Sequence, residues 1–291
     1  MFQQARRIIR HSSGSSRLML LAATASFSRP LLAGPCSLLL RRLARHGKLE
    51  IEYRTNGQRR RIFLRTSQLR SDLYSALELA VGDCYRLGVL PEPEVIIDGG
   101  GNTGLFTLAA AARWPHAKII ICEPVPDNLS VLREHLRLNH LNAEILPICL
   151  GAAPGRASFY CRAANEGSFS RELPFTSEIE VRVRTLSDVY GGLAGTPTLI
   201  KLDIEGVEVD VLEEFLRLPR EKMTIIGELH QARQQKSRLA DLLHRHRWES
   251  QFFDESGHCS LFHLFSPDVA QGLRRDEREV PRNCMASSAR Q

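Results

Sequence analysis

The sequence has no pair of cysteines spaced CxxC, no uninterrupted apolar run of 18 residues and no internal repeat. The first absence argues against a structural zinc site, and seven cysteines, an odd number, do not suggest a disulfide framework. The second absence argues against a membrane-spanning helix. What remains is a chain of 291 residues that are 43% hydrophobic, enough to bury a substantial core. The cysteines fit a reducing compartment, so a cytoplasmic location is expected.

The first 49 residues contain no Asp or Glu but nine Arg and Lys residues. Residues 18–27 are a short apolar run, and residues 23–25 have the A-x-A form of a secretory cleavage site. A composition rich in Arg and Ser is also typical of organellar transit peptides. Residues 1–47 are therefore predicted to be a poorly ordered basic leader. The open alternatives are a secretory signal, a transit peptide and a helix in peripheral contact with a membrane, and the first two would make the protein exported or organellar.

The formal charge of +6 belongs to this leader rather than to the rest of the chain. Residues 50–291 carry 30 positive and 33 negative charges, a net charge of −3. Domains that bind nucleic acid normally carry a positive surface of their own. A nucleic-acid partner is therefore not expected.

Residues 48–93 are predicted to form a small N-terminal cap. Two β-type runs flank an Asn-Gly pair at 56–57, which is a hairpin signal, and residues 70–88 have apolar side chains at helical spacing. Arginines 59–61 follow the turn. They suit a solvated edge strand or, alternatively, contact with an anionic substrate.

Residues 94–266 alternate between strand and helix patterns, which predicts an α/β domain with a mostly parallel sheet and helices on both faces. The predicted parallel strands are residues 95–97, 118–122, 144–150, 198–202 and 223–229. Two further runs, at 251–253 and 260–265, predict a terminal antiparallel hairpin that brings the sheet to seven strands. Residues 267–291 are predicted to be a flexible tail.

A glycine-rich loop, DGGGNTG at 98–104, follows the first predicted strand and precedes the first helix. Glycines let the backbone turn tightly and approach a ligand without a Cβ in the way. The loop matches GxGxxG, and Glu123 lies 19 residues beyond it, where a carboxylate can bind both ribose hydroxyls of an adenosine. NAD and S-adenosylmethionine (SAM) both fit this pattern. Asp98 favours SAM, because it would repel a pyrophosphate but suits a cationic sulfonium and its amino group.

A second group of polar residues ends the fourth and fifth predicted strands. Ligands of open α/β sheets bind at the carboxyl ends of the strands, so Asp203 and Glu205 are expected on the same rim as the glycine loop. Glu208 suits the N-terminus of the following helix. His230 titrates in the range needed to take a proton from a hydroxyl, so it is predicted to be a base or a substrate contact, with Asp203 as the alternative base.

With these residues in place, the sequence resembles the FkbM family of SAM-dependent methyltransferases. The resemblance spans roughly residues 62–266 and is carried by VIIDGGGNTG (95–104), ICEPVPDN (121–128), LGAAPGRASFY (150–160) and LIKLDIEGVEVDVL (199–212). The last stretch is the most specific, since the family pattern reads close to K-[IL]-D-[IV]-E-G-x-E. The resemblance implies a class I methyltransferase (Rossmann-like) fold, SAM as methyl donor, and O-methylation of a hydroxyl on a sugar, glycan or secondary metabolite.

The resemblance also implies roles for individual residues. By position it assigns cofactor binding to Asp98, Gly99, Gly100, Gly101, Asn102, Gly104 and Glu123, and the reaction edge to Lys201, Asp203 and Glu205. The polar segment 163–179 is interpreted as a selector of the acceptor or as a plain surface loop. No metal is predicted, because Glu228 is the only further acid near the fifth strand.

Two other functions remain as alternatives. One is a non-catalytic SAM-fold binding protein, and the other is an NAD(P)-dependent Rossmann oxidoreductase. Methylation of nucleic acid is disfavoured because no [DN]-P-P-[FYW] motif follows the fourth strand. The expected partner is a small-molecule or glycan acceptor.

Overall fold

The computed structural model describes residues 47–81, 83–161, 167–169, 174–253 and 259–279. The predicted leader thus lies almost wholly outside the described residues. No helix within the described ranges is long and apolar enough to cross a membrane.

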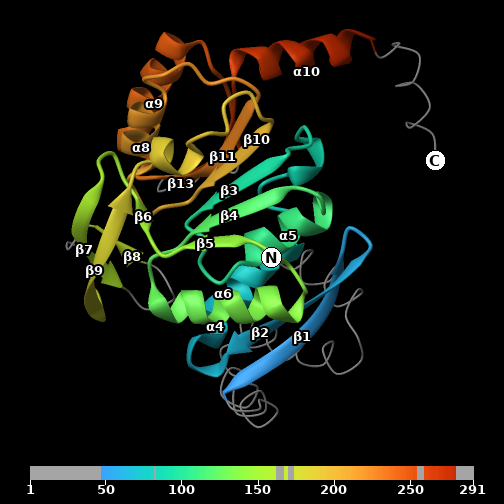
Figure 1. Cartoon of the computed structure of the whole chain (residues 1–291), viewed down its shortest axis with the longest axis vertical. Helices are drawn as coiled ribbons and strands as arrows, with labels where there is room; N and C mark the ends of the chain where they lie inside the picture. The colour runs from blue at the N-terminus through green and yellow to red at the C-terminus, as the bar shows by residue number, and fades with distance from the viewer. Residues whose placement is uncertain (1–46, 82, 162–166, 170–173, 254–258, 280–291) are drawn as a thin grey trace.

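A seven-stranded sheet forms the centre of the molecule (Figure 1). In spatial order its strands are β12 (Glu249–Phe253), β13 (Cys259–Phe265), β11 (Met223–His230), β10 (Thr198–Leu202), β3 (Val95–Gly99), β4 (Lys118–Cys122) and β5 (Glu144–Leu146). The pairs from β11 to β5 are parallel, and β13 pairs antiparallel with both β11 and β12. The predicted class I methyltransferase fold, with its terminal hairpin, is confirmed.

Helices cover both faces of this sheet because its central strands are apolar on both sides. Ile97 and Ile200 face a core shared with helices α7 (Leu186–Tyr190), α8 (Glu208–Phe215) and α9 (Ala232–His246). Ile96 and Leu199 face the opposite core, shared with α5 (Leu105–Arg113) and α6 (Pro126–Leu138). Since successive side chains of a strand alternate between faces, each strand contributes to both layers.

The N-terminal cap begins with the predicted hairpin, β1 (Lys48–Thr55) and β2 (Gln58–Arg65). Its turn residues, Asn56 and Gly57, have φ values of 47° and 76°, as a primed hairpin turn requires. Arg59 and Arg61 pair with the β1 carboxylates Glu52 and Glu50, so both arginines have partners within the hairpin.

The helical part of the cap differs from the continuous pattern predicted over 70–88. A 3-10 turn (Thr66–Gln68) leads into α4 (Leu69–Ser75), which widens into the π-helix η2 (Ala76–Val81), and a second 3-10 turn (Leu87–Val89) follows. A π-helix adds a residue to each turn and often marks a functional site. Here it carries Glu78 toward a cavity that is described below.

His135 of α6 joins the hairpin to the glycine-rich loop. Its Nδ1 lies 2.7 Å from the carbonyl oxygen of Thr103, and the backbone N–H of Phe63 donates to its Nε2 at 3.1 Å. A neutral imidazole protonated at Nδ1 satisfies both contacts. Burial keeps the pKa of His135 below its ordinary 6.5, although the carbonyl oxygens of Thr103 and Phe63, 2.7 and 3.2 Å from its ring nitrogens, oppose the shift.

This arrangement predicts a loss of stability in mild acid. Above pH 6.5 the imidazole of His135 is neutral in both the folded and the unfolded chain. Below pH 6.5 the unfolded chain takes up a proton on this histidine that the folded chain does not. The free energy of unfolding therefore falls as the pH is lowered. His135→Gln should lower stability by about 2 kcal/mol at pH 7.5 through lost buried hydrogen bonds, and it should weaken the pH dependence. Urea unfolding at pH 7.5 and 5.5 tests this, with the exposed His140→Gln as control. An unchanged pH dependence in His135→Gln would contradict the assignment.

A second, smaller sheet replaces part of the predicted third strand and of the polar segment. The run predicted at 144–150 divides into β5 and β6 (Cys149–Leu150), because the chain leaves the main sheet after Leu146. β6 joins β9 (Ser177–Arg184), β7 (Gly155–Cys161) and β8 (Gly167–Ser168) in the order β6-β9-β7-β8. The prediction of a loop over 163–179 is therefore wrong for β8 and the start of β9; residues 162–166 and 170–173 lie outside the described residues.

The prediction of a flexible tail from residue 267 is also wrong for its first part. Pro267–Glu279 forms helix α10, which Asp268 and Ala270 anchor. Asp268 accepts hydrogen bonds from the backbone N–H of Lys222 and from Ser266 Oγ, and Ala270 is buried. These contacts hold the start of the helix against the sheet, and they could not be predicted from the charged sequence of this segment.

Candidate functional site

The glycine-rich loop crosses the carboxyl end of the sheet between β3 and α5. The backbone N–H groups of Gly100 and Gly101 both donate to the carbonyl oxygen of Cys122 at 3.0 Å. Gly100 has a φ of +77°, and a Cβ there would lie 2.0 Å from the backbone oxygen of Asp203. The loop therefore packs against the backbone that follows β10 with no room for a side chain.

Asp98 lies beneath this loop and is fully buried. Its Oδ2 accepts a hydrogen bond from Thr107 Oγ1 at 2.6 Å, and its Oδ1 lies 3.5 Å from Nζ of Lys201. The two residues are register partners on neighbouring parallel strands, which explains the ion pair. Asp98 thus holds the base of the loop, whereas the sequence suggests direct contact with the cofactor.

Glu123 follows β4 and organises the other side of the loop. Its carboxylate accepts the backbone N–H of Asn102 at 2.8 Å and that of Val125 at 2.9 Å, and the side-chain amide of Asn128 at 3.3 Å. Burial raises the pKa of Glu123 above its ordinary value, and these hydrogen bonds oppose the shift. A carboxylate with two oxygens so placed retains acceptor capacity for hydroxyl donors.

A pocket opens beside Glu123, and one of its walls is apolar. The small sheet and the β5–β6 connection supply most of its apolar wall, which includes Ile148, Cys149, Leu150, Phe159 and Phe169. Such a wall suits the flat face of an adenine next to ribose-binding oxygens. No motif in the sequence marks these residues as a site, although the stretch 150–160 contributes to the family resemblance.

Lys201 is the cation at the base of the site, with a side chain 2% exposed. Its Nζ donates to the carbonyl oxygen of Gly100 at 2.6 Å and lies 3.5 Å from Oδ2 of Asp203. Burial alone would lower the pKa of Lys201, but the charges of Asp203 and Asp98 raise it above its ordinary value. Lys201 therefore stays charged and orients both the loop and Asp203.

Asp203 lies at the rim above Lys201. The hydroxyl of Tyr85, from the cap, donates to its Oδ2 at 3.2 Å. Burial would raise the pKa of Asp203, but Lys201 and His230 hold it below its ordinary value. Tyr85 has no signal in the sequence, because it lies outside the motif and reaches Asp203 only through the packing of the cap.

His230 ends β11 and points toward the carboxylates that follow β10. Its Nδ1 lies 2.9 Å from Oε1 of Glu208, and its Nε2 lies 3.6 Å from Oε2 of Glu205. Burial lowers its pKa, but the hydrogen bond to Glu208 and the surrounding carboxylates raise it to about 10. His230 is therefore an imidazolium at neutral pH in this arrangement, which does not favour its predicted role as a base.

Glu208 has a larger part than that of a helix N-terminal acid. It begins α8 as predicted, but its buried Oε1 also accepts the backbone N–H groups of Ile204 and Gly206, at 3.2 and 3.1 Å. It thus fixes both the loop after β10 and the ring of His230. Glu208 is part of the sequence motif at 201–208. Its contact with His230 could not be predicted from that motif, because His230 lies on the neighbouring strand.

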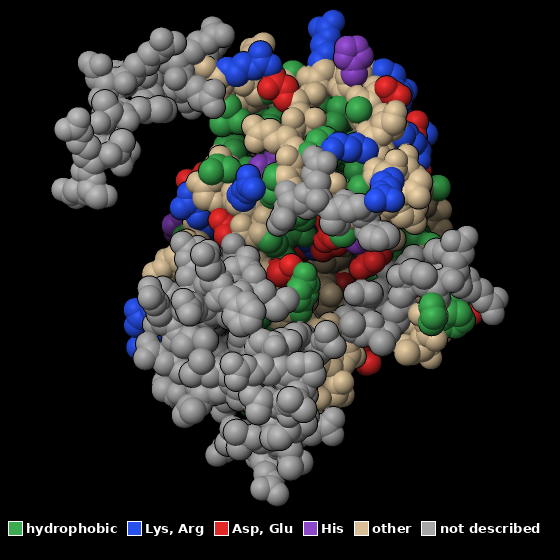
Figure 2. Space-filling model, turned by 180° about the vertical axis from the view of Figure 1, so that it is seen from behind, with side chains coloured by type: hydrophobic (Ala, Val, Ile, Leu, Met, Phe, Trp, Pro, Cys, Tyr) green, Lys and Arg blue, Asp and Glu red, His purple; other side chains and the backbone are tan. Residues whose placement is uncertain are grey.

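A second cavity, of about 620 Å³, opens on the other side of the loop. Tyr74, Glu78 and Tyr85 of the cap line one side of it, and Asp203 and Glu228 of the rim line another. Figure 2 shows acidic side chains gathered around a hollow in this face. The two cavities meet at Gly100, Asn102, Asp203 and Glu205, which line both.

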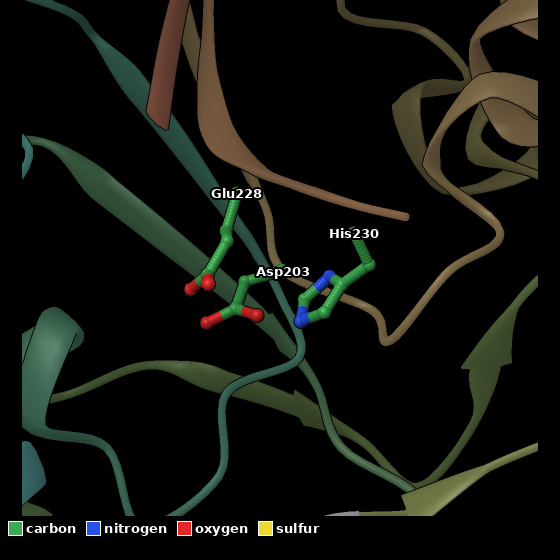
Figure 3. Close-up of side chains that lie close together, drawn as sticks. All are labelled: Asp203, Glu228 and His230. Carbon is green, nitrogen blue, oxygen red and sulfur yellow. The ribbon is translucent and has the colours of Figure 1, made fainter. Parts of the chain in front are cut away.

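Asp203, Glu228 and His230 converge at this rim, as Figure 3 shows. One ligand-type atom from each lies within 4.8 Å of the others. Burial and the charge of Asp203 raise the pKa of Glu228 above its ordinary value. In the sequence Glu228 is an isolated acid, whereas the structure places it beside two predicted site residues.

The site has the parts that a SAM site needs. Gly100 lines both cavities and adds no side chain to either, and Glu123 stands in a pocket that has an apolar wall. The structure thus brings together all of the predicted rim residues and the loop, with Asp98 below it. These observations agree with SAM, the cofactor that the resemblance implies.

Comparison with known proteins gives the same family. The profile of the Methyltransferase FkbM domain matches residues 98–254. Methyltransferase 1 of Beauveria bassiana is 28% identical over 158 residues, 46% of this chain and 64% of that protein. Methyltransferase sdnD of Sordaria araneosa is 27% identical over 170 residues, 47% of this chain and 66% of that protein. The matches thus span slightly less than two thirds of either relative.

Among solved structures, a putative SAM-dependent methyltransferase from Streptococcus mutans aligns with 76% of this chain and 56% of its own, at 12% identity and a TM-score of 0.44. The family profile covers more than half of the sequence and includes the glycine loop, Glu123 and the rim of β10 and β11. The chain therefore belongs to the FkbM methyltransferase family.

Proposed function

We propose that this protein is a SAM-dependent O-methyltransferase that acts on a hydroxyl of a sugar, glycan or secondary metabolite. The observation that carries the proposal is the meeting of two cavities at the glycine loop. A pocket with an apolar wall beside Glu123 suits an adenosine, and an acidic cavity beneath the cap suits a hydroxylated acceptor.

The donor half of the site would hold SAM by shape and hydrogen bonds. Glu123 would accept the ribose hydroxyls, the loop at Gly100 would permit close approach, and the apolar wall would cover the adenine. SAM supplies a methyl group on a positively charged sulfur, which an acceptor nucleophile takes. The carboxylates that line the site, including Asp203 and Glu205, suit that positive charge.

The acceptor half would orient a hydroxyl toward the shared wall of the two cavities. Alignment of the attacking oxygen with the methyl group supplies much of the rate in such a reaction. Lys201 and Tyr85 hold Asp203 in place, so these two are positioning residues. The hydroxyl proton would pass to one of the carboxylates that line the acceptor cavity.

Calorimetric titration of the full chain with SAM and, separately, NADH tests the cofactor. We expect saturable binding of SAM and none of NADH; the reverse result would favour the oxidoreductase and overturn the proposal. Labelled SAM is then incubated with extracts fractionated into sugars, glycans and lipid-linked metabolites. Label on an oxygen supports O-methylation, whereas SAM binding with no transfer to any fraction would indicate the non-catalytic SAM-fold protein.

A further inference from the structure

We propose that Asp203, Glu228 and His230 hold a divalent metal cation of the Mn²⁺ type at the wall of the acceptor cavity. The role of this cation rests on the proposed function, because it would bind the acceptor beside SAM. The binding itself is a separate property that is measured without any acceptor.

The ligand set comes from the ends of two neighbouring parallel strands. Asp203 follows β10, and Glu228 and His230 lie on β11, with one residue between them and therefore on the same side of the strand. Their ligand atoms lie within 4.8 Å of one another, and Figure 3 shows the three side chains turned toward a common point. Two carboxylates and one imidazole suit a divalent ion that accepts both oxygen and nitrogen ligands.

Glu208 supplies an observation independent of that cluster. It is 1% exposed, and its Oε1 lies 2.9 Å from Nδ1 of His230. The cation would take the place of the proton on Nε2, while the proton on Nδ1 stays with Glu208, which is the carboxylate–histidine–metal arrangement of known metal sites. Within the described part of the chain, Oε2 of the same buried carboxylate has no hydrogen-bond partner. Part of the negative charge of this buried carboxylate is therefore not offset by a donor among the described residues.

The charges around the three residues also favour a bound cation. Asp203, Glu205, Glu208 and Glu228 gather around His230, and Lys201 is the cation that contacts Asp203. With a neutral imidazole, four negative charges would face one positive charge. A divalent cation would offset most of that excess, which is costly in a partly buried site.

A cation at this position would contribute to acceptor recognition. It would face the cavity between the cap and the rim, where Tyr74 and Glu78 lie opposite. An acceptor hydroxyl bound to it would lose its proton more readily, as ligation by a divalent ion lowers the pKa of an oxygen ligand. The acceptor class is therefore one with an oxygen, or two adjacent oxygens, free to coordinate a metal.

Titration of the metal-free full chain with Mn²⁺ alone, followed by electron paramagnetic resonance, tests the site. We expect one saturable Mn²⁺ per chain. Glu228→Gln and His230→Gln should each weaken binding by at least about tenfold, and Glu208→Gln by about 10- to 100-fold through the orientation of the ring. Glu78→Gln removes a carboxylate from the same cavity but not from the ligand set, so it should change binding less than about twofold.

Two results would overturn the metal site: no saturable Mn²⁺ binding, or equal weakening by Glu78→Gln and Glu228→Gln, which would mean diffuse attraction to an acidic cavity. Calorimetry with SAM on the same samples separates this proposal from the proposed function. Binding of SAM by the wild-type protein without binding of Mn²⁺ would refute the metal site and leave the proposed function standing. Retained SAM binding by the variants shows that they are folded. If one of the variants at Glu208, Glu228 and His230 does not fold, the other two still decide the outcome.

Discussion

Gly100→Ala is expected to abolish measurable SAM binding and to lower the free energy of unfolding by about 3 kcal/mol. The backbone at Gly100 has a φ of +77°, which disfavours any side chain. The new Cβ would also lie 2.0 Å from the backbone oxygen of Asp203, so it could be accommodated only if the loop and the chain after β10 separated. That separation would break the contact between Lys201 Nζ and the carbonyl oxygen of Gly100.

Urea unfolding and calorimetry with SAM measure both effects. Gly192→Ala is the matched control, because a Cβ there meets no atom within 4 Å and its φ is unstrained. The control should keep wild-type stability within about 0.5 kcal/mol. Wild-type stability together with wild-type SAM affinity in Gly100→Ala would refute the close packing described here.

Glu123→Gln is expected to weaken SAM binding by about 100-fold, or about 2.7 kcal/mol. The carboxylate would accept two ribose hydroxyls, and charge-assisted hydrogen bonds are roughly twice as strong as neutral ones. Glutamine keeps the shape and one acceptor oxygen, but it presents an amide group where the backbone N–H donors of Asn102 or Val125 now bind. The loop and the nucleoside would therefore both lose a partner.

Calorimetry of this variant is compared with Glu144→Gln, an exposed carboxylate on the next strand of the sheet. The control removes the same charge from the same sheet and should leave SAM affinity unchanged. Equal affinities in all three proteins would show that Glu123 does not bind the ribose, and the donor pocket would have to lie elsewhere.

The local pattern of apolar, polar and turn residues predicted most of the helices and strands of the main sheet and the hairpin. An Asn-Gly pair between two β-type runs can hardly form anything but a hairpin, and apolar runs of strand length between helical segments require a covered parallel sheet. The positions of Glu123 and Asp203 at strand ends placed them on one rim, because the carboxyl ends of parallel strands share an edge. These predictions needed only the periodicity and the direction of the chain.

Other parts of the site depend on strand order, register and burial, and none of these is local. Asp98 lies near the end of one apolar strand and Glu123 directly after the next, yet the first lies beneath the loop with Lys201 and the second lines a pocket. The segment between β5 and β9 supplies an apolar wall only because the chain leaves the main sheet after β5. Tyr85 reaches Asp203 from 118 residues away through the packing of the cap.

The sequence by itself determined which chemistry is present: a glycine loop, an acid after the second strand, and the K-L-D-I-E-G-V-E rim, which together indicate the family. Only the tertiary structure decided how those groups act on one another. His230 illustrates the difference, because an isolated histidine titrates near 6.5, and the contact with buried Glu208 raises its pKa to about 10. Residue types come from the chain, but charge states and ligand sets come from distances and desolvation, which exist only once the strands have assembled.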